Sequence, residues 1–210
     1  SLVSPFKQQL FDILFSYFPI TFKPPKNDPY KISNNDLKLS LRSAISGNDM
    51  FAEDAFTNLI DKMSASSPSV KNDTLLTLDS CIKNFKSESI NKNWISLWKA
   101  LKFEIMHSLE DTDAIENSNL TTANSPAKNI DWTLTGTVIT GEEQYKASNY
   151  HTALHVVRSI SLKLVEYDLA AFNAFVIHIL SELKPNFVHG KDLKQSCGVL
   201  SSIGSANSIT

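Results

Sequence analysis

Apolar residues recur along most of the chain at intervals of three or four, which places them on one face of an α-helix. The strongest stripe predicts a helix over residues 92–109, with apolar positions at Trp94, Leu97, Trp98, Leu101, Ile105 and Met106. The same spacing predicts about eight helices in all. Their expected ranges are 5–18, 33–45, 51–63, 68–85, 92–109, 149–166, 168–183 and 192–202.

Residues that favour helix ends mark several of these boundaries. Ser33 and Asp36 have the spacing of a capping box, in which each side chain bonds to the other residue's backbone N–H. A serine followed by Pro68 is typical of a helix start, because proline at the first helical position gives up no hydrogen bond. Pro185 is expected to end the helix that begins near residue 168, since proline disrupts a helix interior.

The predicted helices fall into pairs. Residues 51–85 hold two helices joined by a short Ser-rich turn, which is the shape of a HEAT-type repeat. The other predicted pairs are 92–109 with 149–166, and 168–183 with 192–203. Each pair buries only one face of its own, so stacking of pairs would supply the core. The fold class predicted is therefore all-α, an α-solenoid of HEAT-type antiparallel helix pairs, with a compact helix bundle as the alternative.

Residues 110–148 differ in character from the rest of the chain. They open with Glu110, Asp111, Asp113 and Glu116 and continue in Asn, Thr and Ser, which predicts a mostly disordered insertion. HEAT-type helices are then expected over 1–109 and 149–210. Residues 132–140 alternate weakly as a strand would, but a lone strand is not stable, so coil or an irregular helix is expected there.

The Pro-rich loop over residues 19–35 is the main candidate for function. Its four prolines forbid a regular helix, and Ile20, Phe22 and Tyr30 indicate that it packs on the flanking helices. It is either a solvated loop over the edge of the core or a surface that docks another protein. The candidate protein-interaction residues are Phe22, Lys23, Pro24, Pro25, Lys26, Asp28, Pro29 and Tyr30. RNA binding is disfavoured because the basic patch is small and contains Asp28.

Composition excludes several classes of function. The 210 residues carry 20 Lys and Arg against 22 Asp and Glu, which argues against a nucleic-acid binder with a basic face. Only 6 glycines are present, too few to favour a hairpin-rich β fold or a Rossmann enzyme. The longest uncharged apolar run, Leu169 to Ser181, is shorter than the roughly 20 residues that a membrane helix needs. Cys81 and Cys197 both lie in helical apolar patterns and are expected to be buried, reduced thiols.

Motifs that would carry catalysis or bind a metal are weak. Gly136 and Gly141 have the outer spacing of a phosphate-binding loop, but two glutamates follow where that loop requires Lys and Ser or Thr. His151 and His155 are four residues apart on one helix face, so a metal- or cluster-binding helical domain is the alternative function. Thr152 stands where a metalloprotease would have its glutamate, and ordinary helix histidines are the preferred interpretation. No catalytic, cofactor-binding or metal-ligating residue is assigned.

The segment from Phe11 to Tyr30, FDILFSYFPITFKPPKNDPY, is more specific than a generic loop. Together with KNDTLLTL over residues 71–78, it closely resembles a known family, the large HEAT-repeat adaptor of the cytosolic iron–sulfur cluster targeting complex. This family is named for methyl-methanesulfonate sensitivity and methionine requirement in yeast. The resemblance covers residues 6–109, resumes at 183–187 and 191–197, and does not extend to 110–148. Members are several times longer, so we expect an internal fragment of a yeast-type member.

The resemblance implies a non-enzymatic scaffold. The family links late assembly factors, a WD-repeat propeller subunit and its small partner subunit, to apo-protein clients such as DNA helicases and polymerases of replication and repair. It implies location in cytoplasm and nucleus, and no cofactor, direct nucleic-acid contact or membrane contact. Those assembly factors are expected to bind repeats outside this chain, so the chain would bind clients or extend the solenoid.

Overall fold

The computed structural model describes residues 4–107 except Pro24, Lys26 and Asp28, three strand segments between 130 and 146, and residues 148–206. The strand segments are described by their backbone. The helices of these residues are α1 Lys7–Phe15, α2 Asn34–Ser46, α3 Ala52–Lys62, α4 Pro68–Asn84, α5 Ser87–His107, α7 Asn149–Tyr167, α8 Leu169–His189 and α9 Leu193–Gly204. Short 3₁₀ turns at Ser4–Phe6 and Asp49–Phe51 precede α1 and α3.

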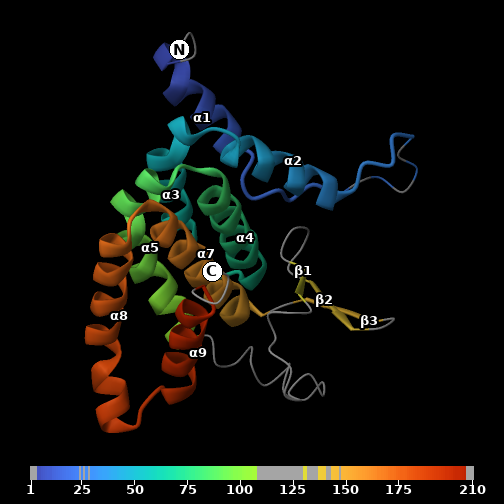
Figure 1. Ribbon diagram of the computed structural model, residues 1–210. Helices are drawn as coiled ribbons and strands as arrows, with labels where there is room; N and C mark the ends of the chain where they lie inside the picture. Colours follow the sequence, from blue (N-terminus) through green and yellow to red (C-terminus); the bar gives the residue numbers. More distant parts are fainter. Residues whose placement is uncertain are drawn as a thin grey trace.

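The helices stack in two layers, as Figure 1 shows. One layer holds α1, α3, α5 and α8, and the other holds α2, α4, α7 and α9. Successive helices pair across the layers, so the repeats are α1–α2, α3–α4, α5–α7 and α8–α9. Within the second layer each helix packs on the next, from α2 through α4 and α7 to α9. The predicted all-α solenoid of HEAT-type pairs is confirmed. The two-layer stacking of successive pairs favours this solenoid over the compact helix bundle.

The core lies between the layers and is built from the apolar stripes that the sequence predicts. Trp98, Leu97 and Leu101 of α5 are fully buried, and so is Ile160 of α7. In the α3–α4 repeat, the rings of Phe56 and Phe85 meet edge to face with centroids 5.6 Å apart. Each large side chain of this kind removes enough apolar area from water to contribute about 1.5–3 kcal/mol. Apolar packing between the layers is therefore a major source of stability.

Helix starts agree closely with the sequence signals. Ser33 Oγ accepts a hydrogen bond from the Asp36 backbone N–H, and Asp36 Oδ2 accepts one from the Ser33 N–H, so the capping box is present. Pro68 occupies the first turn of α4. In contrast, α5 begins at Ser87 rather than near residue 92, because Ile90 of its first turn is fully buried.

The prediction that Pro185 ends its helix is wrong. Helix α8 continues through Pro185 to His189 and ends at Gly190, whose φ of 65° is left-handed. The Lys191 N–H then bonds to the Asn186 carbonyl, 3.0 Å away. The last turns are held in place because Leu183 is buried and the Asn186 side chain donates to Ser196 Oγ of α9. Tertiary packing thus outweighs the hydrogen bond that proline removes.

A small antiparallel sheet corrects the expectation of coil or irregular helix for residues 137–140, while residues 132–136 lie outside the described residues. Its strands are β1 Ile130–Asp131, β2 Thr137–Thr140 and β3 Glu143–Lys146, in the order β1-β2-β3. Thr140 pairs with Glu143, so only two residues of sequence separate β2 from β3, and a hairpin supplies the partner strand judged missing. Most of the predicted disordered insertion 110–148, including 110–129, lies outside the described residues, as do the last two residues of the predicted helix 92–109. The domain boundaries stay a prediction.

Two further expectations concern cysteines and membranes. Cys81 is buried, and burial raises the pKa of its thiol, so it stays protonated. Cys197 of α9 is exposed, which contradicts the expectation that it is buried. Among the described helices, none combines the length and apolar character needed to cross a bilayer.

Candidate functional site

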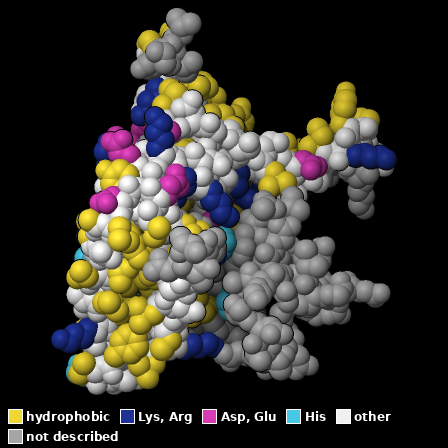
Figure 2. All heavy atoms as spheres, viewed as in Figure 1, with side chains coloured by type: hydrophobic (Ala, Val, Ile, Leu, Met, Phe, Trp, Pro, Cys, Tyr) yellow, Lys and Arg dark blue, Asp and Glu magenta, His cyan; other side chains and the backbone are white. Residues whose placement is uncertain are grey.

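The loop between α1 and α2 projects away from the two helix layers (Figure 1). Apolar and basic side chains gather on this projection in Figure 2. Tyr30 is 81% exposed and Phe22 45% exposed, so neither ring is buried against the flanking helices as the sequence suggested. Ile20 alone of the three predicted contacts is half-buried. Prolines and positive charge along the loop favour an extended backbone held out in solvent.

The structure brings some of the predicted interaction residues onto one exposed loop. Phe22, Lys23, Pro25, Pro29 and Tyr30 are all exposed. The remaining three predicted residues, Pro24, Lys26 and Asp28, lie outside the described residues.

The base of the loop is fixed to the helices. Phe18 is buried and stacks on Phe15, with ring centroids 5.3 Å apart. At the other end, the Asn34 side chain donates a hydrogen bond to the Phe22 carbonyl. Because both ends are anchored, the loop presents its aromatic side chains from a defined position. That arrangement suits recognition of another protein better than a free linker does.

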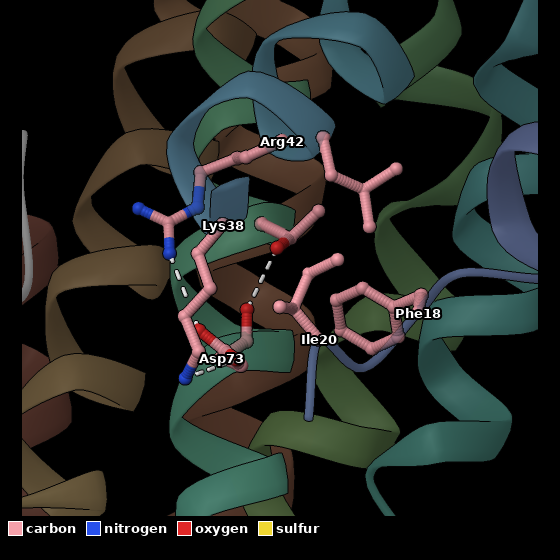
Figure 3. Close-up of a pocket in the computed structure, with 7 residues that line it drawn as sticks. Phe18, Ile20, Lys38, Arg42 and Asp73 are labelled. Carbon is pink, nitrogen blue, oxygen red and sulfur yellow. Dashed lines mark hydrogen bonds and ion pairs between the residues drawn. The ribbon is translucent and has the colours of Figure 1, made fainter. Parts of the chain in front are cut away.

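Beside the loop base lies a small cavity, shown in Figure 3. It is lined by Phe18, Ile20, Lys38, Leu41, Arg42, Asp73 and Thr77. Its volume of about 10 Å³ suits a single water molecule. Pockets for small molecules are much larger, on the order of 300–1,000 Å³. The cavity is therefore a packing feature between α2 and α4 and not a cofactor site.

Charged groups in this cavity bind α2 to α4. Lys38 Nζ lies 2.7 Å from Asp73 Oδ2, and Arg42 Nη2 lies 3.5 Å from Asp73 Oδ1. In Figure 3 both cations point from α2 toward that one carboxylate. Burial lowers the pKa of Arg42, and the nearby carboxylates of Asp73 and Asp79 oppose that shift. A buried carboxylate needs such partners, since desolvation without them would cost several kcal/mol.

A second buried carboxylate, Asp79, binds α4 to α7. Ser159 Oγ donates to Asp79 Oδ1 at 2.6 Å, and Lys83 Nζ lies 2.6 Å from Oδ2. His155 Nε2 lies 3.4 Å from Oδ1. Burial by itself would raise the pKa of Asp79. The hydrogen bonds and charge interactions with His155 and Lys83 have the larger effect, so the pKa lies below its usual value. Asp79 is thus an ionised bridge between repeats.

The two histidines of the alternative metal hypothesis have different surroundings. His155 bonds toward Asp79, whereas His151 Nδ1 lies 2.7 Å from Ser148 Oγ at the start of α7. Burial lowers the pKa of His151, and the charge of Lys194 adds to this. Within the described residues, no group of three or more His, Cys, Asp or Glu side chains is arranged to hold a metal ion. In the described geometry His155 lies beside a carboxylate of α4, and His151 lies beside the residue that precedes α7.

In the first layer a third carboxylate joins α5 to α8. Trp98 Nε1 donates to Glu182 Oε2 at 2.8 Å, and Lys102 Nζ lies 3.1 Å from the same oxygen. Burial raises the pKa of Glu182, but these hydrogen bonds outweigh it and lower the pKa overall. Sequence reasoning missed the bridging roles of Asp73, Asp79 and Glu182. The sequence did contain a signal, because each of these acidic residues lies within the apolar pattern of a helix. An acidic side chain that is buried there needs hydrogen-bond or ion-pair partners.

Residues 2–107 match the family model MMS19_N, described as Dos2-interacting transcription regulator of RNA-Pol-II. The Saccharomyces cerevisiae DNA repair/transcription protein MMS19 is 52% identical over 98% of this chain, which spans 18% of that relative. The MMS19 nucleotide excision repair protein homolog of Mus musculus is 36% identical over 52% of the chain and 11% of the relative.

A fission-yeast relative extends the comparison. The Schizosaccharomyces pombe DNA repair/transcription protein mms19 is 33% identical over 51% of the chain and 11% of its own length. The chain thus corresponds to a small part of each of these relatives. Since a family model matches its first half and the budding-yeast relative matches nearly all of it, the chain belongs to the MMS19 family.

Proposed function

We propose that this chain is a section of a non-enzymatic scaffold, an adaptor in cytosolic iron–sulfur protein assembly. The observation that supports this most directly is an α-solenoid body bearing an anchored, exposed aromatic loop in a member of the MMS19 family. Relatives carry names that refer to DNA repair and transcription. An adaptor that serves repair enzymes would account for those names without touching DNA itself.

The adaptor would link two groups of proteins. One is the late assembly machinery, a WD-repeat propeller subunit and its small partner subunit. The other consists of apo iron–sulfur clients such as DNA helicases and polymerases. Because the chain spans 18% of its yeast relative, we assign the assembly factors to repeats outside this chain and client binding to this section. We place the protein in the cytoplasm and the nucleus, where such clients are made and act.

The loop between α1 and α2 is the binding element in this proposal. Phe22 and Tyr30 expose their rings to water, and aromatic residues of this kind are enriched among the side chains that dominate protein interfaces. Their rings lose little conformational freedom on binding, because each has only two rotatable side-chain bonds. Lys23 adds a positive charge beside them, which would favour a client segment that combines an apolar anchor with acidic residues.

Binding measurements on the full polypeptide that contains this chain test the proposal. The variant Phe22→Ala with Tyr30→Ala is compared with the unchanged protein for an apo helicase client and, separately, for the propeller subunit. We expect client affinity to fall at least about tenfold, since loss of two interface aromatics commonly costs more than 1 kcal/mol each. Affinity for the propeller subunit should stay the same.

Phe103→Ala is the matched control, because Phe103 is an exposed aromatic residue on α5, away from the loop. It should leave client affinity unchanged. Equal client affinity for the loop variant and the unchanged protein would remove the loop from the proposal. Stoichiometric iron or zinc in untagged protein, lost on replacing His151 and His155, would instead favour the metal-binding alternative.

A further inference from the structure

The two helix layers differ in charge. The helices of the second layer, α2, α4, α7 and α9, carry seven Lys and Arg residues against four Asp and Glu residues. The helices of the first layer carry six Lys and Arg residues against seven Asp and Glu residues. Because the whole chain has a formal net charge of -2, the positive charge is a local property of the second layer. Figure 2 shows Lys and Arg side chains, with a histidine beside them, where Figure 1 places α4.

A first group of basic side chains lies where α2 meets α4. Lys38 and Arg42 share the carboxylate of Asp73, as Figure 3 shows, so the formal charge of this group is positive. The Asp73 side chain is 10% exposed and the Lys38 side chain 23% exposed. The lysine is therefore the more accessible of the two, and the carboxylate lies beneath it.

A second group lies where α4 meets α7. Lys83 Nζ is 2.6 Å from Asp79 Oδ2 and 3.3 Å from His155 Nε2. The Lys83 side chain is 45% exposed, whereas the Asp79 side chain is 4% exposed. A molecule that approaches this group from solvent therefore meets Lys83 before it meets the carboxylate.

Both lysines are held in position before any ligand binds. Fixing a long side chain in a complex costs conformational entropy, and this cost lowers affinity. Asp73 already restricts Lys38, and Asp79 already restricts Lys83, so part of that cost is met when the chain folds. A lysine ammonium group has three N–H donors, so each can bond to a ligand carboxylate as well as to its partner on α4.

The spacing of the two groups limits what can reach both. Asp73 and Asp79 are six residues apart on α4, which corresponds to about 9 Å along the helix axis. They also face different neighbours, α2 and α7. A ligand that bonds to both lysines therefore needs two negative charges on the order of 10 Å apart. In an extended peptide, side chains three positions apart have about this separation.

We infer that the second layer binds an acidic segment of a partner protein, with one acidic side chain at Lys38 and another, three or four positions along, at Lys83. Separate carboxylates fit two separate cations. A nucleic-acid strand carries a phosphate about every 3.4 Å, so it would need a continuous basic stripe and would also lie over Asp73 and Asp79. The inference does not depend on the adaptor role, and its residues lie outside the loop between α1 and α2.

Fluorescence anisotropy with a labelled synthetic peptide tests this inference. The probe is a peptide of repeated Glu-Ser-Ser, titrated with the full polypeptide that contains this chain. The variant Lys38→Gln with Lys83→Gln removes both accessible cations. We expect its dissociation constant to be at least about tenfold higher than that of the unchanged protein at low ionic strength, since both lysines would pair with the ligand. The difference should shrink as salt is added, because salt screens accessible ion pairs.

Lys92→Gln with Lys99→Gln is the matched control. Both lysines are exposed on α5 of the first layer, and Lys92 is likewise paired with a carboxylate, that of Glu88. This variant changes the net charge by the same amount and should bind the peptide as the unchanged protein does. The single variant Lys83→Gln leaves the group at Asp73 intact and should raise the dissociation constant about threefold. It keeps the test decisive if the double variant is unstable, which circular dichroism establishes.

The outcomes separate the possible ligands. Selective weakening of peptide binding by the Lys38 and Lys83 substitutions supports the inference. Equal weakening by the control overturns it, because net charge alone would then govern binding. Unchanged affinity also overturns it. Tighter binding of a single-stranded oligonucleotide, lost with the same two lysines, would assign the surface to nucleic acid and overturn it as well. Phe22→Ala with Tyr30→Ala should leave peptide affinity unchanged, so failure of the loop proposal is distinguishable from failure of this one.

Discussion

At the scale of single residues, three buried or half-buried carboxylates hold the repeats in register. Asp73 joins α2 to α4, Asp79 joins α4 to α7, and Glu182 joins α8 to α5. Hydrophobic contact alone would allow neighbouring helices to slide or rotate, since apolar attraction is not directional. Hydrogen bonds and ion pairs from a fixed carboxylate specify one arrangement. These residues are structural, and the candidate binding residues lie elsewhere, on the exposed loop.

Asp79→Asn tests the central bridge. The amide keeps the shape of the side chain but lacks the negative charge that lies beside Lys83 and His155. We therefore expect the free energy of unfolding to fall by about 2–3 kcal/mol. Urea denaturation followed by circular dichroism measures this change. Asp61→Asn, at an exposed position on α3, should change stability by less than about 0.5 kcal/mol. Similar losses in both variants would show that Asp79 makes no special contribution.

The same variant has a defined pH dependence. The pKa of Asp79 is lower in the folded protein than in the unfolded chain, so its contribution is present above the ordinary Asp pKa of about 3.9. As pH falls through the folded pKa, the carboxylate is protonated and this contribution is lost. The stability difference between Asp79→Asn and the unchanged protein should therefore be largest near neutral pH and shrink below about pH 4. A constant difference down to about pH 3 would contradict the ionised bridge.

At the scale of elements, local signals set most helix starts, while packing set some of the ends. The Ser33–Asp36 capping box and Pro68 were recognisable because they act through hydrogen bonds and backbone angles within one turn. Pro185 was misjudged because its effect depends on what the following turn contacts. Asn186 bonds to α9, so the helix continues to Gly190. The hairpin of β2 and β3 was missed because weak alternation in two short segments gives little signal until they pair.

Gly190→Ala tests the true end of α8. Gly190 has φ of 65°, and an added Cβ would meet no atom within 4 Å, so only backbone conformation opposes the change. We expect a loss of about 1–2 kcal/mol in stability, the cost of a left-handed conformation for an L-residue. Gly204→Ala is the matched control, because Gly204 is helical and also has open space at its Cβ. Thermal denaturation should show a lower Tm for the first variant and no loss for the second.

At the scale of the whole molecule, the α5–α7 repeat closes across a long segment of sequence. Helix α7 packs on α5, α4, α8 and α9, so it is the most central helix of the described residues. Pairing of α5 with α7 was predictable, because each has a strong apolar stripe that needs a partner. From this close packing we expect the two helices to hold together without residues 112–129. The repeat order along the solenoid follows from this pairing.

Deletion of residues 112–129 tests this interpretation. Because α5 and α7 meet over a large area, shortening their connection should change the free energy of unfolding by less than about 1 kcal/mol, as loop-closure entropy depends weakly on length. Differential scanning calorimetry should find Tm within about 3 °C of the unchanged protein. A decrease of more than about 10 °C would mean that the deleted residues stabilise the helical body.

The sequence by itself determined the helical class, the pairing of helices and membership of a family, because period, caps and residue order act locally or are compared directly. It did not determine which apolar residues stay in water. Tyr30 and Leu180 belong to apolar patterns much like those of the buried core, yet both are exposed. Burial depends on whether another element lies opposite a side chain, and that is decided only when distant parts of the chain pack together. The tertiary structure therefore located both the exposed loop and the exposed apolar residues of α8.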